Sequence, residues 1–521
     1  MKIRAFLSAG VALAALATPA FADDAAIEKR LDAMQRMIEA QQHQIEGQNA
    51  EIKSLRGALK KKGVHVEAAA AEPAPPPVEA QVRQQQVRLG DLERKVDAQS
   101  EELHQQADSS WSFKNGRPTI TSRDGRFSLA IRALGQFDAA YYMQPSSARS
   151  LPAANGPDLS SGANFRRAQL GIQGKLFGDW SYNFNTEFGG SGGSESGGRV
   201  QSLYVEYDGL KPFAFRIGAY PPAVGLEDNT GSADTLFLER AGPSEIVRNA
   251  VGGDGRDAAS ILYVTDTFYG SISYTGARVG DGAMFDEQQA LLGRAAVSLW
   301  SDSDSRLVLS GTAADMFRGN DSAAGPGSAR SLTLSTAPEL TVDSTGTKLV
   351  TTGGVDTNSA KFWGVEAGGN WRNFYGQAGY FGYGINQRVV PPAATKPDLN
   401  FNGWYAQASW ILTGESRGYS VANAAFTAPT PEGKWGAWEL AGRYSDVDLN
   451  DKAGLFGLAT PYGGVRGGEQ KIWTACINWY PNSVLRFALD YQWIDVSRLS
   501  GVGADVGQDL QALSLRTQIA L

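Results

Sequence analysis

Histidine and cysteine, which carry most nucleophilic and metal chemistry in proteins, are scarce and unevenly placed in this chain. His43, His65 and His104 all precede residue 110, and the chain has a single cysteine, Cys476. A Ser-His-Asp triad and a His-ligated zinc site both need imidazole groups. The long C-terminal region therefore lacks the residues for these sites. We expect no enzyme activity, no metal and no cofactor, and we expect Cys476 to be a small packed residue.

Arginine is the residue type of this region whose chemistry could serve a function. Its planar guanidinium stays charged and donates forked hydrogen bonds to oxyanions such as phosphate. Arg166 and Arg167 are adjacent, and two neighbouring residues of a strand need two environments. Each arginine could instead be a structural charge that pairs with a nearby carboxylate. The candidate anion-binding residues, which would line a pore, are Arg132, Arg166, Arg167, Arg216, Arg240, Arg443 and Arg486.

Two other patterns resemble ligand sites only superficially. Residues 189–193 read Gly-Gly-Ser-Gly-Gly, but neither a helix nor a Gly-Lys-Ser/Thr element is expected after them, so they indicate a flexible loop. Asp302, Asp304 and Asp321 could contact calcium, but their spacing does not complete an EF-hand. Neither pattern gives a reason to expect a bound phosphate or metal.

Alternating apolar and polar residues predict that the arginines lie on membrane-spanning β-strands. Leu485, Phe487 and Leu489 alternate with Arg486 and Asp490, and similar alternation occurs at 127–141, 180–188, 213–217, 438–444 and 513–521. Repeated alternation with terminal Trp or Tyr is typical of a transmembrane barrel, although a soluble β-sandwich also alternates. About 400 residues at roughly 25 per strand give on the order of 16 strands. We therefore predict an all-β transmembrane antiparallel barrel over residues 107–521.

One loop of this barrel is a candidate constriction. Residues 228–239 follow a Tyr-Pro-Pro break at 220–222 and could fold into the lumen, with Arg240 near the end of the loop. The net charge of the chain is −7. This total does not set ion selectivity, because only charges at the narrowest part of a lumen act on ions in transit.

The N-terminal region predicts an exported helical stalk. Basic residues, an apolar core and Ala20-Phe21-Ala22 indicate a signal peptide over 1–22. Apolar residues at alternating four- and three-residue steps predict a coiled coil over 23–67, and a second short coiled coil over 81–106 follows a Pro/Ala-rich linker at 68–80. We expect an α-helical stalk in the periplasm that assembles with its copies, with a trimer as the natural number below a trimeric barrel.

Seven segments spread over the barrel region resemble the phosphate-selective porin O/P family. They are FRRAQLG at 165–171, KLFGDWSY at 175–182, RIGAY at 216–220, FLER at 237–240, ILTGESR at 411–417, WELAGRY at 438–444 and NWYPN at 478–482. The resemblance implies a trimeric 16-stranded outer-membrane porin, often with anion preference and sometimes with phosphate selectivity. The chain departs from the family at Gln169, where an arginine is frequent, and in its few barrel lysines.

The hypothesis for function is passive diffusion of small hydrophilic solutes through an outer-membrane porin of a Gram-negative bacterium. Anion preference is expected, and phosphate selectivity is a narrower expectation from the resemblance. The expected partners are outer-membrane lipid, inorganic anions such as phosphate, two further copies of the chain and peptidoglycan at the stalk, but no nucleic acid. The alternative is a structural anchor whose coiled coil tethers the membrane to the cell wall.

Overall fold

The structure is a computed structural model that describes residues 53, 87–92, 94–97, 109–114, 116–144, 158–190, 198–280, 285–325, 327–389 and 395–521. The chain divides into two compact units, residues 1–102 and 103–521. In the first unit, residues 87–92 and 94–97 are helical. The predicted signal peptide, the linker, nearly all of the first coiled coil and the rest of the second lie outside the described residues.

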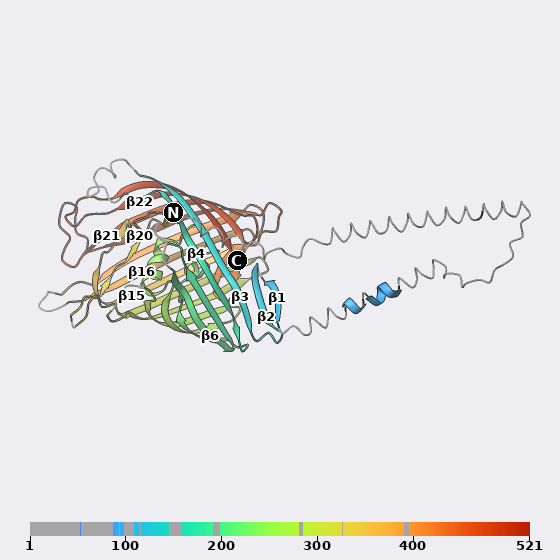
Figure 1. The fold of residues 1–521 in the computed structure, drawn as a ribbon. Helices are drawn as coiled ribbons and strands as arrows, with labels where there is room; N and C mark the ends of the chain where they lie inside the picture. The colour runs from blue at the N-terminus through green and yellow to red at the C-terminus, as the bar shows by residue number, and fades with distance from the viewer. Residues whose placement is uncertain are drawn as a thin grey trace, which may run out of the picture. The chain divides into compact units, whose positions relative to one another are not determined.

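The second unit is a closed antiparallel β-barrel (Figure 1). In the described part of the chain, sixteen strands form its wall, and β23 pairs with β3 to close it, from Gln511 opposite Met143 to Ala520 opposite Leu134. This closure confirms the predicted architecture and strand number. The wall strands are β3 (Ser128–Met143), β4 (Gly162–Leu176), β5 (Trp180–Glu187), β6 (Arg199–Leu210), β7 (Phe213–Ala219), β8 (Arg256–Val264), β9 (Phe268–Arg278), β10 (Gln289–Ser301), β11 (Ser305–Arg318), β15 (Val355–Trp371), β16 (Phe374–Gln387), β17 (Leu399–Ile411), β20 (Ala437–Asp451), β21 (Val465–Tyr480), β22 (Leu485–Ser497) and β23 (Gln508–Ala520).

The remaining elements are short. A hairpin of β1 (Ser109–Lys114) and β2 (Arg117–Ser122) precedes the barrel, and β2 pairs with the start of β3. The connections between wall strands contain α4 (Leu226–Asn229), α5 (Gly242–Val251), β12 (Ser331–Leu332), β13 (Ser335–Thr336), β14 (Val350–Thr351), β18 (Arg417–Ser420) and β19 (Ala425–Pro429).

The two faces of the wall have the alternation that the sequence predicts. On β3, Phe137 is 43% exposed, whereas its neighbours Gln136 and Asp138 are fully buried. The outward aromatic residues also stack across strands, as Trp438 does on Trp479 with ring centroids 5.4 Å apart. An apolar aromatic outside and a polar inside are what a barrel in lipid requires. Among the described helices, none has the length and apolar character needed to cross a membrane.

Three segments fold into the barrel and fill part of its lumen. One is residues 327–354 between β11 and β15, where Glu339 pairs with Arg443 of the wall and accepts a hydrogen bond from the backbone N–H of Gly242. The other two lie beside the open space of the lumen. The first is the connection 220–255 between β7 and β8, which carries α4 and α5; we call it the inner loop. The second is the connection 412–436 between β17 and β20, which carries β18 and β19; we call it the inner hairpin. Because neighbouring strands are antiparallel, successive connections alternate between the two ends of the barrel. The inner hairpin enters from the end where the other connections are short turns, and the inner loop enters from the opposite end.

The inner loop lies against one side of the wall. α5 packs on β16, β17 and β20, where Ile246 and Val247 join a buried apolar cluster with Phe362 and Tyr405. The Tyr383 hydroxyl donates a 2.9 Å hydrogen bond to the carbonyl of Pro243. A side chain at Gly403 would approach Pro243 to 3.1 Å, so glycine permits this close contact. The lumen is therefore packed on this side and is hollow on the side of β3 to β9.

Candidate functional site in the barrel lumen

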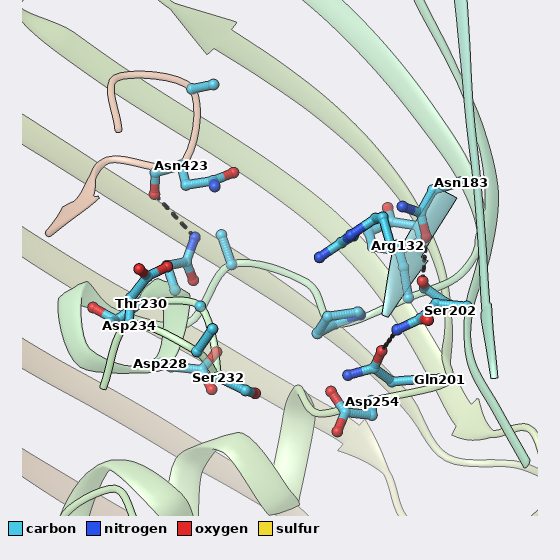
Figure 2. A pocket seen from close by; sticks show the side chains of 18 of the residues that line it. Arg132, Asn183, Gln201, Ser202, Asp228, Thr230, Ser232, Asp234, Asp254 and Asn423 are labelled. Atoms are coloured by element: carbon cyan, nitrogen blue, oxygen red, sulfur yellow. Dashed lines mark hydrogen bonds between the residues drawn. The ribbon is translucent and has the colours of Figure 1, made fainter. Parts of the chain in front are cut away.

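The hollow side of the lumen is a polar cavity of about 290 Å³. Its wall side is made of residues from β3 to β9, such as Arg132, Asn183 and Ser202, and its inner side is made of the inner loop and Asn423 of the inner hairpin. Figure 2 shows these two groups of side chains on opposite sides of the space. A volume near 300 Å³ is at the lower end of the range for small-molecule sites. The cavity could therefore admit ions and small organic solutes.

Arg132 is a candidate residue whose charge has no ion-pair partner in the described part of the chain. It lies on β3 and lines the cavity beside Asn183 and Ser202 (Figure 2). In the described part of the chain, no carboxylate lies within ion-pair distance of its guanidinium. Arg117 on β2 lines the same cavity, and its buried Nε has no hydrogen-bond partner among the described residues. The sequence prediction missed Arg117, because β2 precedes the barrel wall and pairs with β3 only near its beginning.

Arg216 also lines the cavity but is paired. Its Nη2 lies 2.6 Å from Oε2 of Glu206 on the adjacent strand. The guanidinium stacks over the rings of Tyr204 and Tyr220, at 4.5 and 5.3 Å from their centroids. The carboxylate and the aromatic faces hold the group in one orientation while leaving part of it at the cavity.

Arg240 is the third candidate that lines the cavity, and it belongs to an ion-pair cluster of the inner loop. Its Nε lies 3.8 Å from Asp228, and Arg248 on α5 contacts Asp228 at 2.7 Å and Asp254 at 2.6 Å. Burial alone would raise the pKa of Asp254, but the charge of Arg248 outweighs it and holds the pKa below the ordinary value. Asp228 and Asp254 are thus neutralised by arginines of their own loop. The sequence prediction did not include Arg248.

Arg166 and Arg167 lie together on one carboxylate. β4 has a bulge at Arg166. Gln136 pairs with Arg167 and Phe137 pairs with Phe165, so Arg166 is left out of the pairing with β3. Arg166 binds Glu239 of the inner loop with both Nε (2.6 Å) and Nη2 (2.9 Å), and Arg167 lies 3.9 Å from the same carboxylate. Strand alternation predicts two environments for this pair, but the bulge turns both side chains inward, toward Glu239.

The electrostatics of Glu239 follow from this arrangement. Burial opposes its ionisation, but the charges of Arg166 and Arg167 outweigh burial and keep its pKa well below the ordinary value. Glu227 on α4 shows the opposite balance: burial raises its pKa to about 7, although the charge of Arg443 opposes the shift. In the inner loop, Glu239 and Asp254 are therefore firmly ionised, whereas the pKa of Glu227 is raised to about 7.

Arg443 and Arg486 face inward as predicted and contact the inner loop, but they do not line the 290 Å³ cavity. Arg443 pairs with Glu339 and lies 3.5 Å from Glu227. Arg486 donates to the Leu236 carbonyl at 2.9 Å and to the Asn478 side chain at 2.7 Å. These wall arginines anchor the inner loop through the carboxylate of Glu227 and the carbonyl oxygens of Glu239 and Leu236.

The inner hairpin is held in the same way. Arg294 on β10 donates to the carbonyl oxygens of Asn423 (3.0 Å) and Ala424 (2.6 Å). Arg417 on β18 pairs with Glu439 on β20 at 3.0 Å. Arg294 and Arg417 were not among the predicted site residues, because nothing in the alternation indicated that a connection would fold back into the lumen.

No metal site accompanies these arginines in the described part of the chain, where no group of three or more His, Cys, Asp or Glu side chains could hold an ion. The described acidic residues of the lumen lie mainly opposite arginines. The arrangement can therefore hold or guide small charged solutes, chiefly through guanidinium, amide and hydroxyl groups.

Comparison with known proteins identifies the family. The family model described as phosphate-selective porin O and P matches residues 149–521. The chain belongs to this family. It is therefore an outer-membrane porin, and the family and barrel fold point to a channel rather than an enzyme.

Individual relatives are distant. Porin O of Pseudomonas aeruginosa is 25% identical over 362 residues, which cover 67% of this chain and 80% of that protein. An uncharacterized protein of Caulobacter vibrioides is 26% identical over 396 residues, which cover 73% of this chain and 71% of that protein. Among solved structures, the anion-selective porin of Comamonas acidovorans aligns with a TM-score of 0.47 at 12% identity, covering 76% of this chain and all of that chain.

Proposed function

We propose that this porin conducts small hydrophilic solutes by passive diffusion and prefers anions. The observation that carries the proposal is the pair Arg117 and Arg132, which line the cavity without a carboxylate partner in the described residues. A cation beside a narrow water-filled path acts more strongly than a screened surface charge. The other candidates, Arg166, Arg167, Arg216, Arg240, Arg443 and Arg486, would add positive potential around the inner loop.

Phosphate is the anion that the family description suggests. Forked guanidinium groups suit phosphate oxygens, and Gln169, Asn183 and Ser202 add neutral hydrogen-bonding groups along the cavity. We therefore extend the proposal to phosphate as a permeating anion that competes with chloride.

Assembly is part of the same proposal. Leu89, Leu92 and Val96 lie on described helical residues and are 58–62% exposed. Exposed apolar residues at coiled-coil spacing suit a helix that packs against copies of itself. We propose a homotrimer with a coiled-coil stalk in the periplasm, where it could contact peptidoglycan.

Planar-bilayer recording of the purified protein tests the channel. We expect stepwise conductance and, under a potassium chloride gradient, a reversal potential of the sign that anions produce. Adding phosphate should reduce the chloride current. Arg132→Gln should shift the reversal potential toward zero, whereas Arg126→Gln, in an exposed turn, should not. Folded protein without conductance would favour the anchor hypothesis, and a cation-selective potential would contradict the anion preference.

A further inference from the structure

The inner side of the cavity carries an unpaired negative charge that an anion channel does not need. Asp234 of the inner loop lines the cavity, and its Oδ1 accepts a 3.0 Å hydrogen bond from the backbone N–H of Ala428. In the described part of the chain, no arginine or lysine lies within ion-pair distance of this carboxylate. Its acidic neighbours differ, because Asp228 and Asp254 are both paired with Arg248.

The unpaired charges of opposite sign lie on opposite sides of the cavity. Figure 2 shows Arg132 with Asn183 and Ser202 on the wall side, and Asp234 with Thr230 on the side of the inner loop. Asp234 and Arg132 are near enough for their charges to interact, although they form no direct ion pair. A field between them must therefore cross the space that a solute occupies.

A dipolar solute fits this arrangement better than a simple anion. Its carboxylate could face Arg132 and Arg117 while its ammonium group faces Asp234, and each end would meet a charge that has no ion-pair partner among the described residues. A simple anion gains only the first contact and is repelled by Asp234. A neutral solute gains neither.

We propose that the cavity favours zwitterionic solutes of amino-acid size, which it orients between Asp234 and the arginines Arg132 and Arg117. The inference rests on the proposed channel function and specifies one of its solute classes. The wall residues Asn183, Ser202 and Gln201 line the same space and supply neutral hydrogen-bonding groups beside the carboxylate end.

Uptake into proteoliposomes with glycine and glycolamide tests the inference. These two molecules are isomers, so size is matched and only the zwitterion carries separated charges. We expect glycine to enter about threefold faster through the wild-type channel, the effect of a weak ion pair at a partly hydrated site. The preference should shrink at molar salt, because screening acts over a few ångströms there.

Three variants test which side chains produce the preference. Asp234→Asn and Arg132→Gln should each bring the ratio of the two rates close to one, and Asp234→Glu should retain it. Asp266→Asn, in the exposed turn after β8, is the matched control and should behave as wild type. Heat-modifiable migration on gels verifies that each variant is a folded barrel.

The outcomes separate this inference from the channel proposal. Chloride conductance with equal glycine and glycolamide rates in the wild type would overturn the inference and leave the channel intact. A preference that survives Asp234→Asn would overturn the assignment to Asp234. Absence of conductance in folded protein would overturn the channel proposal itself.

Discussion

Glu239 is the carboxylate on which arginines from two strands far apart in the sequence converge. Arg166 on β4 contacts it at 2.6 Å, and Arg516 on β23 contacts it at 3.1 Å. Moving such charges out of water costs several kcal/mol per ion, and the mutual attraction only offsets this cost. The cluster therefore does more to fix where the inner loop lies than to raise stability. Arg166 has this positioning contact in addition to the selectivity role that we propose.

Replacing Arg166 and Arg167 with alanine should reduce anion preference and weaken the block of chloride current by phosphate. The lumen loses two positive charges, while Glu239 keeps its own charge and its contact with Arg516. Reversal potentials under a salt gradient measure the change. Alanine at half-buried Lys396, in the connection between β16 and β17, is the control, because that residue does not line the lumen cavity. Equal potentials in the wild type and the folded double variant would make the pair purely structural.

Arg516→Met should destabilise the barrel by about 3–5 kcal/mol, the usual effect of leaving one buried charge unpaired. Arg516 binds Asp138 with two hydrogen bonds of 2.7 and 2.6 Å, and both side chains are fully buried. The urea midpoint of unfolding, or the temperature at which the folded gel band disappears, measures the loss. Adding Asp138→Asn should restore much of it. A double variant as unstable as Arg516→Met would show that packing, not charge, is responsible.

The sequence predicted the direction of these side chains better than their partners. Strand alternation has a period of two, so it correctly predicted that Arg443 and Arg486 face inward. It failed at Arg166, because a bulge shifts the register by one residue and is not visible in the alternation. The alternation could not identify the partner of Arg516, since Asp138 lies 378 positions away in sequence.

At the scale of elements, the connections decide how much of the lumen is open. The expectation that residues 228–239 form a loop inside the barrel agrees with the inner loop, whose Leu236 and Leu238 carbonyls accept hydrogen bonds from Arg486 and Arg516. The inner hairpin was not expected. Its entry depends on contacts such as Arg294 with the Asn423 carbonyl, which only the closed barrel brings together.

Shortening the inner hairpin should raise single-channel conductance. A two-residue turn in place of residues 414–434 removes Ala422 and Asn423 from the cavity lining. The variant also needs Glu439→Gln, because the deletion removes Arg417 and would leave Glu439 buried without its cation. Planar-bilayer conductance at high salt reports the open cross-section. Glu439→Gln in the full-length chain separates the charge change from the deletion, and unchanged conductance in a folded shortened barrel would contradict the expectation.

At the scale of the whole molecule, the barrel closes by its own contacts. The ladder between β23 and β3 runs from Gln511 to Ala520, and the ion pair of Arg516 with Asp138 lies within it. Architecture was predictable because each wall strand carries its own local alternation. The segments that fill the lumen were less predictable, because their positions depend on contacts between distant parts of the chain.

Deletion of residues 23–106 should leave barrel folding and conductance largely unchanged. The deleted segment precedes β1, and the strands that close the barrel all follow it. The chain also divides into separate compact units near this boundary, at residue 102.

Heat-modifiable gel migration tests folding, planar-bilayer recording tests conductance, and cross-linking counts the subunits. A full-length chain with a scrambled order of residues 23–67 is the matched control, because it keeps length and composition but loses the heptad spacing. If the deletion variant folds and conducts but yields monomers, the coiled coil holds the assembly together without shaping the channel. If it yields no heat-modifiable barrel, the stalk is needed for folding and the two units are not independent.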